Sequence, residues 1–324
     1  MTAMTAKENA RRAVRFAGPA WMPVLYFNKD QERSDFVLTG ASAPPDFAPE
    51  TPGRSEWGYV WVREDDTMGQ PKCPPLGAGW DAYYNYRLPD ATDPRRYEDA
   101  RRAVRDNPDR YIIGSLGITG FNQYTFLRGF ENTMEDLYLE RDKLLRLMDD
   151  IVEYESALIR HLLEAGVDCI MFGDDWGTQN CLMIDPAMWR EVFLPFYRRQ
   201  FALCHSGGAD VCFHSCGQVL DILPELVEAG ADILNLNQPD IFPLDKLAET
   251  LAGRVCLMCP VDHQTVAIHG TPDEIHAYAE RLHRLLAAEQ GGFIAYIEEY
   301  HSVGMRDEQY RAICDAFETL RGRR

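Results

Sequence analysis

The stretch Asp210-Val-Cys-Phe-His-Ser-Cys-Gly217 indicates both the fold and the chemistry of this chain. A short apolar run of β-branched and aromatic residues that ends in glycine is typical of a buried parallel strand. Side chains alternate between the two faces of a strand, so His214 and Cys216 point to the same side. An imidazole and a thiolate that face one cavity are two ligands of a possible Zn²⁺ site. A hydrogen-bonded histidine beside a buried thiol has the same spacing, so the rest of the sequence must distinguish the two interpretations.

Short apolar runs alternate with longer amphipathic segments from about residue 105 onward. The runs predict strands at 111–116, 169–172, 211–214, 233–236, 255–258 and 293–297. The amphipathic segments predict helices over 134–165, 186–205, 220–228, 244–251, 272–288 and 306–321. Asp185-Pro186 and Thr271-Pro272 each place a good N-cap residue before a proline at the first helical position. Gly166, Gly230 and Gly253 follow predicted helices, as C′ residues do.

Repeated strand–helix units imply parallel strands joined by right-handed crossovers. With an early strand at 22–27, the chain has seven or eight units, which predicts a (β/α)₈ TIM barrel. A doubly wound open sheet is the alternative, but no G-x-G-x-x-G turn or phosphate loop supports it. Residues 30–105 are rich in Pro, Gly, Trp and Tyr and are expected to form an elaboration over the barrel mouth. Residues 1–324 are therefore expected to form a single barrel domain.

The charge composition indicates which classes of binding partner are unfavourable for this protein. The chain has 33 Lys plus Arg against 51 Asp plus Glu, a formal net charge of -18, which disfavours nucleic acids and anionic membrane surfaces. No stretch approaches the roughly 20 apolar residues that cross a bilayer. The segment 1–9 has no apolar signal core, so we expect a cytoplasmic protein. The nine cysteines are expected to be mostly buried thiols of a reducing compartment.

Polar residues follow five consecutive predicted strands. The active site of a TIM barrel lies at the carboxyl ends of its strands, so these residues should converge. In the order of the strands, the residues are Asp174 and Asp175; His214 and Cys216; Asn235, Asn237 and Gln238; Cys259, Asp262 and His263; and Glu298, Glu299 and His301. This set favours a polar pocket that can hold a metal. For Asp174 and Asp175, capping of a helix or loop is the alternative to an acid–base role.

Several segments together resemble the uroporphyrinogen-decarboxylase-like superfamily, and within it the zinc-dependent methyltransferases that work with corrinoid proteins. The matching segments are 173–179, 185–197, 214–217 with 223–226, 230–235 with 238–239, and 291–294. They cover about residues 165–300 in the order of the family. The resemblance implies a (β/α)₈ barrel, in agreement with the strand pattern. It also implies that zinc is bound by His214 and Cys216.

The third zinc ligand of the family is usually a cysteine after the Gly-Gly-aromatic-Ile strand, and this chain has none there. The corresponding position falls at about Glu299, so we expect Glu299 to be the third ligand, which zinc accepts. Glu298, Cys259 or the absence of metal are the alternatives. Accordingly, Glu299→Gln should lose metal, whereas Cys259→Ser should keep it.

The resemblance implies an enzyme that moves a methyl group between a small substrate, a methyl ether or a thiol, and a corrinoid. The chain has no Asp-x-His-x-x-Gly motif, so the corrinoid (cobalamin) is expected on a separate protein. Asp174 or Asp175 would be the catalytic partner that holds His214 in its ligating tautomer. The predicted substrate-binding residues are Gln179, Asn237, Gln238 and Trp176.

Two other classes of function compete with this one. True porphyrinogen decarboxylases hold substrate carboxylates with a two-arginine loop after the first strand, and the equivalent stretch 25–33 has no such pair. A metal-free lyase would use Asp174 or Asp175 as its acid–base group, and a non-catalytic barrel would only bind a partner. The aromatic residues of the elaboration either stack against an aromatic methyl ether or pack in the core: Trp57, Tyr59, Trp61, Tyr83, Tyr84 and Tyr86.

Overall fold

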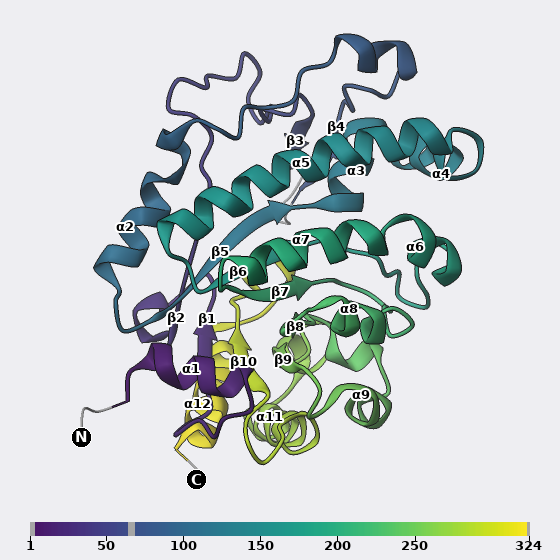
Figure 1. The fold of residues 1–324 in the computed structure, drawn as a ribbon. Helices are drawn as coiled ribbons and strands as arrows, with labels where there is room; N and C mark the ends of the chain where they lie inside the picture. Colours follow the sequence, from purple (N-terminus) through teal and green to yellow (C-terminus); the bar gives the residue numbers. More distant parts are fainter. Residues whose placement is uncertain (1–3, 64–68, 323–324) are drawn as a thin grey trace.

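The computed structural model describes residues 4–63 and 69–322. Eight parallel strands form one sheet in the order β1-β10-β9-β8-β7-β6-β5-β2. They are β1 (Val24–Tyr26), β2 (Phe36–Gly40), β5 (Tyr111–Ile118), β6 (Cys169–Gly173), β7 (Asp210–His214), β8 (Ile233–Asn235), β9 (Cys256–Cys259) and β10 (Phe293–Ile297). Helices connect the strands and surround the sheet (Figure 1). The predicted (β/α)₈ barrel is confirmed.

The helices cover the outside of the barrel. Two predicted helices are each divided: 134–165 is α4 (Phe130–Leu139) and α5 (Arg141–Ala165), and 186–205 is α6 (Pro186–Val192) and α7 (Leu194–Ser206). The other predicted helices are α8 (Leu223–Ala229), α9 (Leu244–Leu251), α11 (Pro272–Leu286) and α12 (Asp307–Arg321). The helices that the pattern did not predict are α1 (Ala6–Val14), α2 (Glu98–Asp106), α3 (Gly120–Arg128) and α10 (Val266–His269).

The predicted helix ends are present. The Asp185 side chain accepts hydrogen bonds from the N–H groups of Ala187 and Met188, and Thr271 forms a capping box with Glu274. Gly166 and Gly230 adopt the left-handed conformation after α5 and α8. None of the described helices has the length and apolar character needed to span a bilayer.

The seam between β1 and β2 is held by side chains in addition to the backbone. The N–H of Val24 donates to Asp35 Oδ2 at 2.9 Å, and the N–H of Tyr26 donates to Ser34 Oγ at 3.2 Å. The N–H of Asp35 donates in return to the Val24 carbonyl at 3.0 Å. Asp35 and Ser34 therefore satisfy backbone groups where the two terminal strands of the sheet meet, which completes the barrel.

The elaboration is shorter than the predicted 30–105, because β2 and α2 belong to the barrel itself. The insertion between them contains the antiparallel pair β3 (Val60–Val62) and β4 (Gln70–Lys72). Its aromatic rings attach it to the barrel helices: Trp57 lies edge-on to Tyr154 of α5 at 4.7 Å, and Tyr59 lies edge-on to Phe126 of α3 at 5.4 Å. Strand β2 was missed because it is short and follows the polar stretch 28–35.

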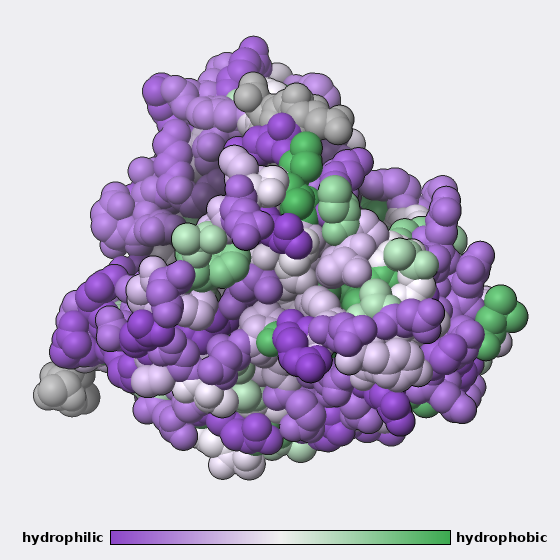
Figure 2. Space-filling model, turned by 90° about the horizontal axis from the view of Figure 1, so that it is seen from above, coloured by the Kyte–Doolittle hydropathy of each residue, from purple (hydrophilic) through white to green (hydrophobic). Residues whose placement is uncertain are grey.

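The strands bury both faces. Their inward side chains form one core cluster inside the barrel, made of residues such as Leu25, Ile113, Cys212, Ile233 and Ile294. Their outward side chains join a second, larger cluster against the helices. The face of the molecule in Figure 2 is mostly hydrophilic, and its apolar side chains are separated from one another. The acidic composition leads us to expect such a surface.

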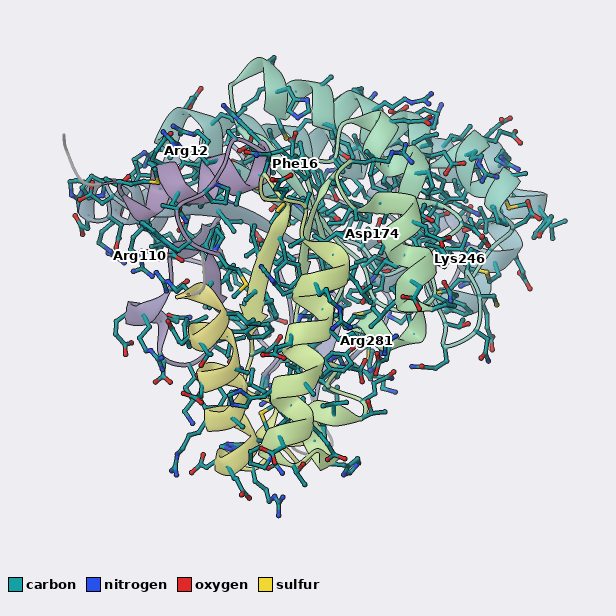
Figure 3. The ribbon with its side chains drawn as sticks, turned by 90° about the horizontal axis from the view of Figure 1, so that it is seen from below. Arg12, Phe16, Arg110, Asp174, Lys246 and Arg281 are labelled. Carbon is teal, nitrogen blue, oxygen red and sulfur yellow. The ribbon has the colours of Figure 1, made fainter. Side chains whose placement is uncertain are left out.

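Helix α1 closes the amino-terminal end of the barrel. Its residues Ala10 and Val14 are buried in the cluster inside the barrel. Lys7 and Arg11 pair with Asp168 at 3.0 and 3.1 Å, and Arg15 pairs with Asp210 at 3.1 Å, at the starts of β6 and β7. In the view from below, α1 (purple, with Arg12 labelled) lies close to Phe16 and the start of β10 (Figure 3). The opposite end is left for the functional site.

Candidate metal centre

Asp175, His214 and Cys216 lie together at the carboxyl ends of β6 and β7. One potential ligand atom from each lies within 4.8 Å of the other two, and this is the single such group among the described residues. The His214 Nε2 atom is 3.6 Å from Cys216 Sγ and 3.5 Å from Asp175 Oδ1. Strand alternation explains the grouping, because Met171 and Cys212 face the barrel interior and the inward series continues to Asp175, His214 and Cys216.

The orientation of His214 is set by the next strand. His214 Nδ1 lies 2.8 Å from Asn235 Oδ1, while Asn235 Nδ2 donates to the Met258 carbonyl at 3.0 Å and to Asn237 Oδ1 at 3.1 Å. This network assigns the Asn235 oxygen as acceptor, so Nδ1 carries the imidazole proton. The Nε2 lone pair then faces Cys216 and Asp175, as a metal ligand requires.

Asn235 therefore has the role that we expected of Asp174 or Asp175. The sequence placed Asn235 only among the polar residues at the strand ends, although His214 and Asn235 are register partners in adjacent strands. Two inward-facing residues at the same level of neighbouring strands are within reach of each other, and this signal could have identified the pair.

Asp175 is the carboxylate nearest to the histidine and cysteine. Its Oδ1 accepts from the backbone N–H of Cys216 at 2.7 Å. The Asn122 side chain, in the amide orientation that satisfies both groups, pairs with the backbone C=O and N–H of Asp175 at 3.0 and 3.2 Å. Asp175 is thus held from two sides, and it also lines a pocket of about 500 Å³ beside α3.

Asp174 is a structural residue. It is fully buried and accepts hydrogen bonds from the N–H groups of Phe121 at 3.0 Å and Asn122 at 2.8 Å, in the first turn of α3. The Tyr197 hydroxyl also donates to it. Burial raises the pKa of the Asp174 carboxyl well above its usual value. Asp174 faces outward from β6 and caps α3, and its acid–base role stays a prediction.

The predicted third ligand, Glu299, is placed away from the centre. Glu299 Oε1 is 2.7 Å from His301 Nδ1, and the Glu299 backbone pairs with the Asn28 side chain. In β10 the inward residues are Ile294 and Tyr296, so the inward series continues to Glu298, and Glu299 follows the outward series. Asp175, not Glu299, therefore lies next to His214 and Cys216, and a role of Glu299 as the third ligand stays a prediction.

The two alternative ligands are also located. Glu298 faces the interior and accepts from the hydroxyls of Tyr296 at 3.0 Å and Tyr300 at 2.8 Å, and burial raises its pKa. Cys259 is fully buried in the outer cluster between strands and helices. Of these two, Glu298 is the one on the side of the metal-ligand group, because it continues the inward series of Ile294 and Tyr296.

The predicted substrate residues have different environments. Trp176 is fully buried and stacks on Phe121 at 4.2 Å, so it packs behind the site and does not line it. Gln238 Oε1 accepts from the Gly217 N–H at 2.7 Å and orders the loop after β7. Asn237 contacts Asn235, which places it in the network that orients His214. Gln179 is exposed in the loop after β6.

The donor set suits zinc. Thiolate, imidazole and carboxylate are the ligands that zinc sites combine, and three protein ligands leave a fourth position open. Burial and the adjacent Asp175 carboxylate raise the pKa of the Cys216 thiol well above its usual value. A cation at this position would reverse that electrostatic effect and favour the thiolate.

Comparisons with known proteins give one family match and a similar solved structure. A family model described as uroporphyrinogen decarboxylase (URO-D) matches residues 100–319. A methyltransferase from Methanosarcina mazei is similar in structure, with a TM-score of 0.70 and 16% identity over 98% of this chain and 99% of that chain. A 2,3-dimethylmalate lyase reaches a TM-score of 0.42 and 14% identity over 91% of this chain and 81% of that one. The search of curated proteins found no match.

Proposed function

The chain belongs to the uroporphyrinogen decarboxylase family, and on this premise we propose that it is a zinc-dependent methyltransferase. It would move a methyl group between a small substrate, a methyl ether or a thiol, and a corrinoid carried by a separate protein, for example in O-demethylation. The observation that carries the proposal is the group of Asp175, His214 and Cys216 with the tautomer of His214 set by Asn235. The similarity in fold to the Methanosarcina mazei methyltransferase supports it.

The proposed zinc ligands are His214 Nε2, Cys216 Sγ and an Asp175 carboxylate oxygen, with Glu298 as the alternative to Asp175. Zn²⁺ bound there would supply a Lewis acid that lowers the pKa of a substrate hydroxyl or thiol. Asn235 retains the proton on His214 Nδ1, and the Cys216 N–H orients Asp175. The hydroxyls of Tyr296 and Tyr300 hold Glu298 at the inward face of β10.

A porphyrinogen decarboxylase reaction is less well supported. The two cations after β1 are engaged by neighbouring side chains: Lys29 lies 4.4 Å from the Tyr310 ring centre, and Arg33 lies 4.8 Å from the Tyr26 ring centre and pairs with Glu318. A substrate with several carboxylates would need such cations in the site. The burial of Asp174 as the cap of α3 also speaks against its use as an acid–base group.

Metal analysis tests the proposal. Protein purified without added zinc should hold about one equivalent of zinc, and Cys216→Ser and Asp175→Asn should each lose most of it. Glu299→Gln and Cys259→Ser are matched controls and should keep it, since neither side chain lies in the ligand group. Less than about a tenth of an equivalent in the unmodified protein, with no metal able to restore it, would refute the zinc site.

A second assay separates methyl transfer from lyase chemistry. Zinc-loaded protein, a methyl ether and a cob(I)alamin should give methylcobalamin, which is followed by its absorbance. The carbon–oxygen bond breaks, the methyl group passes to cobalt, and the electron pair stays on the oxygen, which takes a proton from solvent. Cys216→Ser should abolish this reaction, whereas a metal-free lyase would keep its activity in that variant.

A further inference from the structure

We infer that the substrate presents an uncharged aromatic ring to the pocket beside α3, and that Ile118 and Phe126 determine this specificity. The inference rests on the proposed function and names its substrate class. The pocket has a volume of about 500 Å³ and is bordered by the insertion, α3 and the loop after β6. This volume lies in the usual range for small-molecule sites. Its apolar lining residues are Trp61, Ile118, Phe121, Phe126, Phe130 and Met183.

The aromatic walls of the pocket are held by their own neighbours. Phe126 makes ring contacts with Tyr59 at 5.4 Å and with Trp61 at 5.9 Å, which connects α3 to the insertion. Phe121 stacks on Trp176 at 4.2 Å from behind. Rings fixed in this way give a flat ligand edge-to-face and stacking contacts without losing further side-chain freedom.

Asp175 joins the pocket to the metal-ligand group. Asp175 is one of the residues that line the pocket, and its Oδ1 lies 3.5 Å from His214 Nε2. A substrate whose oxygen or sulfur lies at the group of Asp175, His214 and Cys216 can therefore extend its carbon skeleton into the pocket. Methanol or a similarly small compound would leave nearly all of the apolar volume unfilled, so it would gain little from these walls.

The charge of the lining restricts the ring further. Asp175 is the one charged residue among the described residues that line the pocket. A ring that bears a carboxylate or phosphate would be repelled by it and would find no cation as a partner. The chemistry therefore favours a neutral phenol, aryl methyl ether or aryl thiol.

Equilibrium binding, followed by intrinsic tryptophan fluorescence at pH 7, tests the inference. The probes are 2-methoxyphenol, methanol and 4-methoxybenzoate. We expect 2-methoxyphenol to bind at least about tenfold more tightly than either of the other two. Equal affinity for 2-methoxyphenol and methanol, or for 2-methoxyphenol and 4-methoxybenzoate, would overturn the inference.

Two variants locate the binding. Ile118 is 39% exposed at the pocket, so Ile118→Trp should fill the volume without opening the core and weaken 2-methoxyphenol binding at least about tenfold. Phe126→Leu should weaken it in the same direction. Leu139→Trp adds the same side chain at a position on α4 that is 76% exposed and outside the pocket, and it should change nothing. Unchanged binding in both Ile118→Trp and Phe126→Leu would also overturn the inference.

The unmodified protein and the Cys216→Ser variant distinguish a failure of this inference from a failure of the proposed function. Cys216→Ser removes a proposed zinc ligand but leaves the apolar walls intact, so it should still bind 2-methoxyphenol. Ring binding in a protein that takes up no zinc would refute the methyltransferase proposal alone. Zinc binding together with methyl transfer from methanol, and no preference for a ring, would refute the substrate class alone.

Discussion

Asp174 and Asp175 are neighbours in the sequence and have opposite roles, because successive side chains leave a strand on opposite faces. Asp174 points toward the helices and caps α3, whereas Asp175 points into the barrel mouth beside His214 and Cys216. Glu298 and Glu299 divide in the same way at the end of β10. Asn235 shows a third role, since it contacts no proposed substrate but orients the histidine.

The role of Asn235 can be tested by metal affinity. Asn235→Leu removes the acceptor of the His214 Nδ1 proton, so the ring loses its fixed tautomer and orientation. We expect the affinity for zinc, measured by competition with a chelator, to fall about 10- to 100-fold. Gln179→Leu changes an exposed amide in the neighbouring loop and serves as the control. An unchanged zinc affinity in Asn235→Leu would show that the histidine is oriented by other contacts.

Glu155 gives a prediction for pH dependence. It is buried, accepts from the Gly120 N–H and from Gln200, and burial raises its pKa from 4.5 to about 7. The unfolded chain releases this proton at the lower pH, so the contribution of the neutral acid is complete below about pH 4.5 and is lost as pH rises through about 7.

The variant Glu155→Gln stays neutral, and the Gln200 amide can rotate to pair with it. Its free energy of unfolding should therefore rise relative to the parent protein between pH 4.5 and 8, by an amount on the order of 2–4 kcal/mol. Urea unfolding at a series of pH values measures the difference. Parallel pH profiles for the two proteins would contradict the prediction.

At the scale of the elements, the sequence predicts the ends of helices best where the residues that form the signal lie within one helical turn. The N-cap of α11 was predicted from Thr271-Pro272, because an N-cap residue and the helix start that it caps lie within one turn. The division between α6 and α7 also has a local signal, since Pro195 lies in the first turn of α7 and cannot continue a preceding helix. The division between α4 and α5 at Glu140 has no proline or glycine, and we find no local signal for it.

The cap of α11 can be tested on stability. Thr271→Ala removes the acceptor for the Glu274 N–H and should lower the free energy of unfolding by about 1 kcal/mol in a urea titration. Thr250→Ala is the matched control, because Thr250 bonds within α9 to the Lys246 carbonyl and caps nothing. The control should shift stability by less than about 0.5 kcal/mol. Equal losses in both variants would refute the capping role.

At the scale of the whole molecule, the barrel depends on contacts between distant parts of the chain. Asp35 at the β1–β2 seam accepts from the Val24 N–H and pairs with Arg321 of the last helix at 2.8 Å. Helix α1 closes the same, amino-terminal end of the barrel through Asp168 and Asp210. These contacts were not predicted, because nothing in a local pattern shows that residues 286 positions apart are partners.

Because Asp35 is buried at the β1–β2 seam, we expect its substitution to lower the free energy of unfolding strongly. Asp35→Ala removes the acceptor of the buried Val24 N–H and the partner of Arg321 Nη2, while Arg321 keeps its longer contact with Glu318 at 3.8 Å. The loss should cost about 3 kcal/mol of unfolding free energy. Asp46→Ala removes a carboxylate that is 71% exposed and paired with Arg95, and it should cost less than about 1 kcal/mol. Calorimetry of both variants checks the contrast, and a loss below 1 kcal/mol in Asp35→Ala would contradict it.

The sequence by itself determined the parallel strands, the (β/α)₈ barrel and the pairing of His214 with Cys216, because strand periodicity and N-caps act over a few residues. Only the tertiary structure decided that Asp175 lies beside them and that Asn235 orients the histidine. The physical reason is register: pairing of Gly173 with His214 and of His214 with Asn235 brings the ends of β6, β7 and β8 to one level of the barrel mouth. The alternation of faces then selects Asp175 over Asp174, and Glu298 over Glu299, as the inward carboxylates.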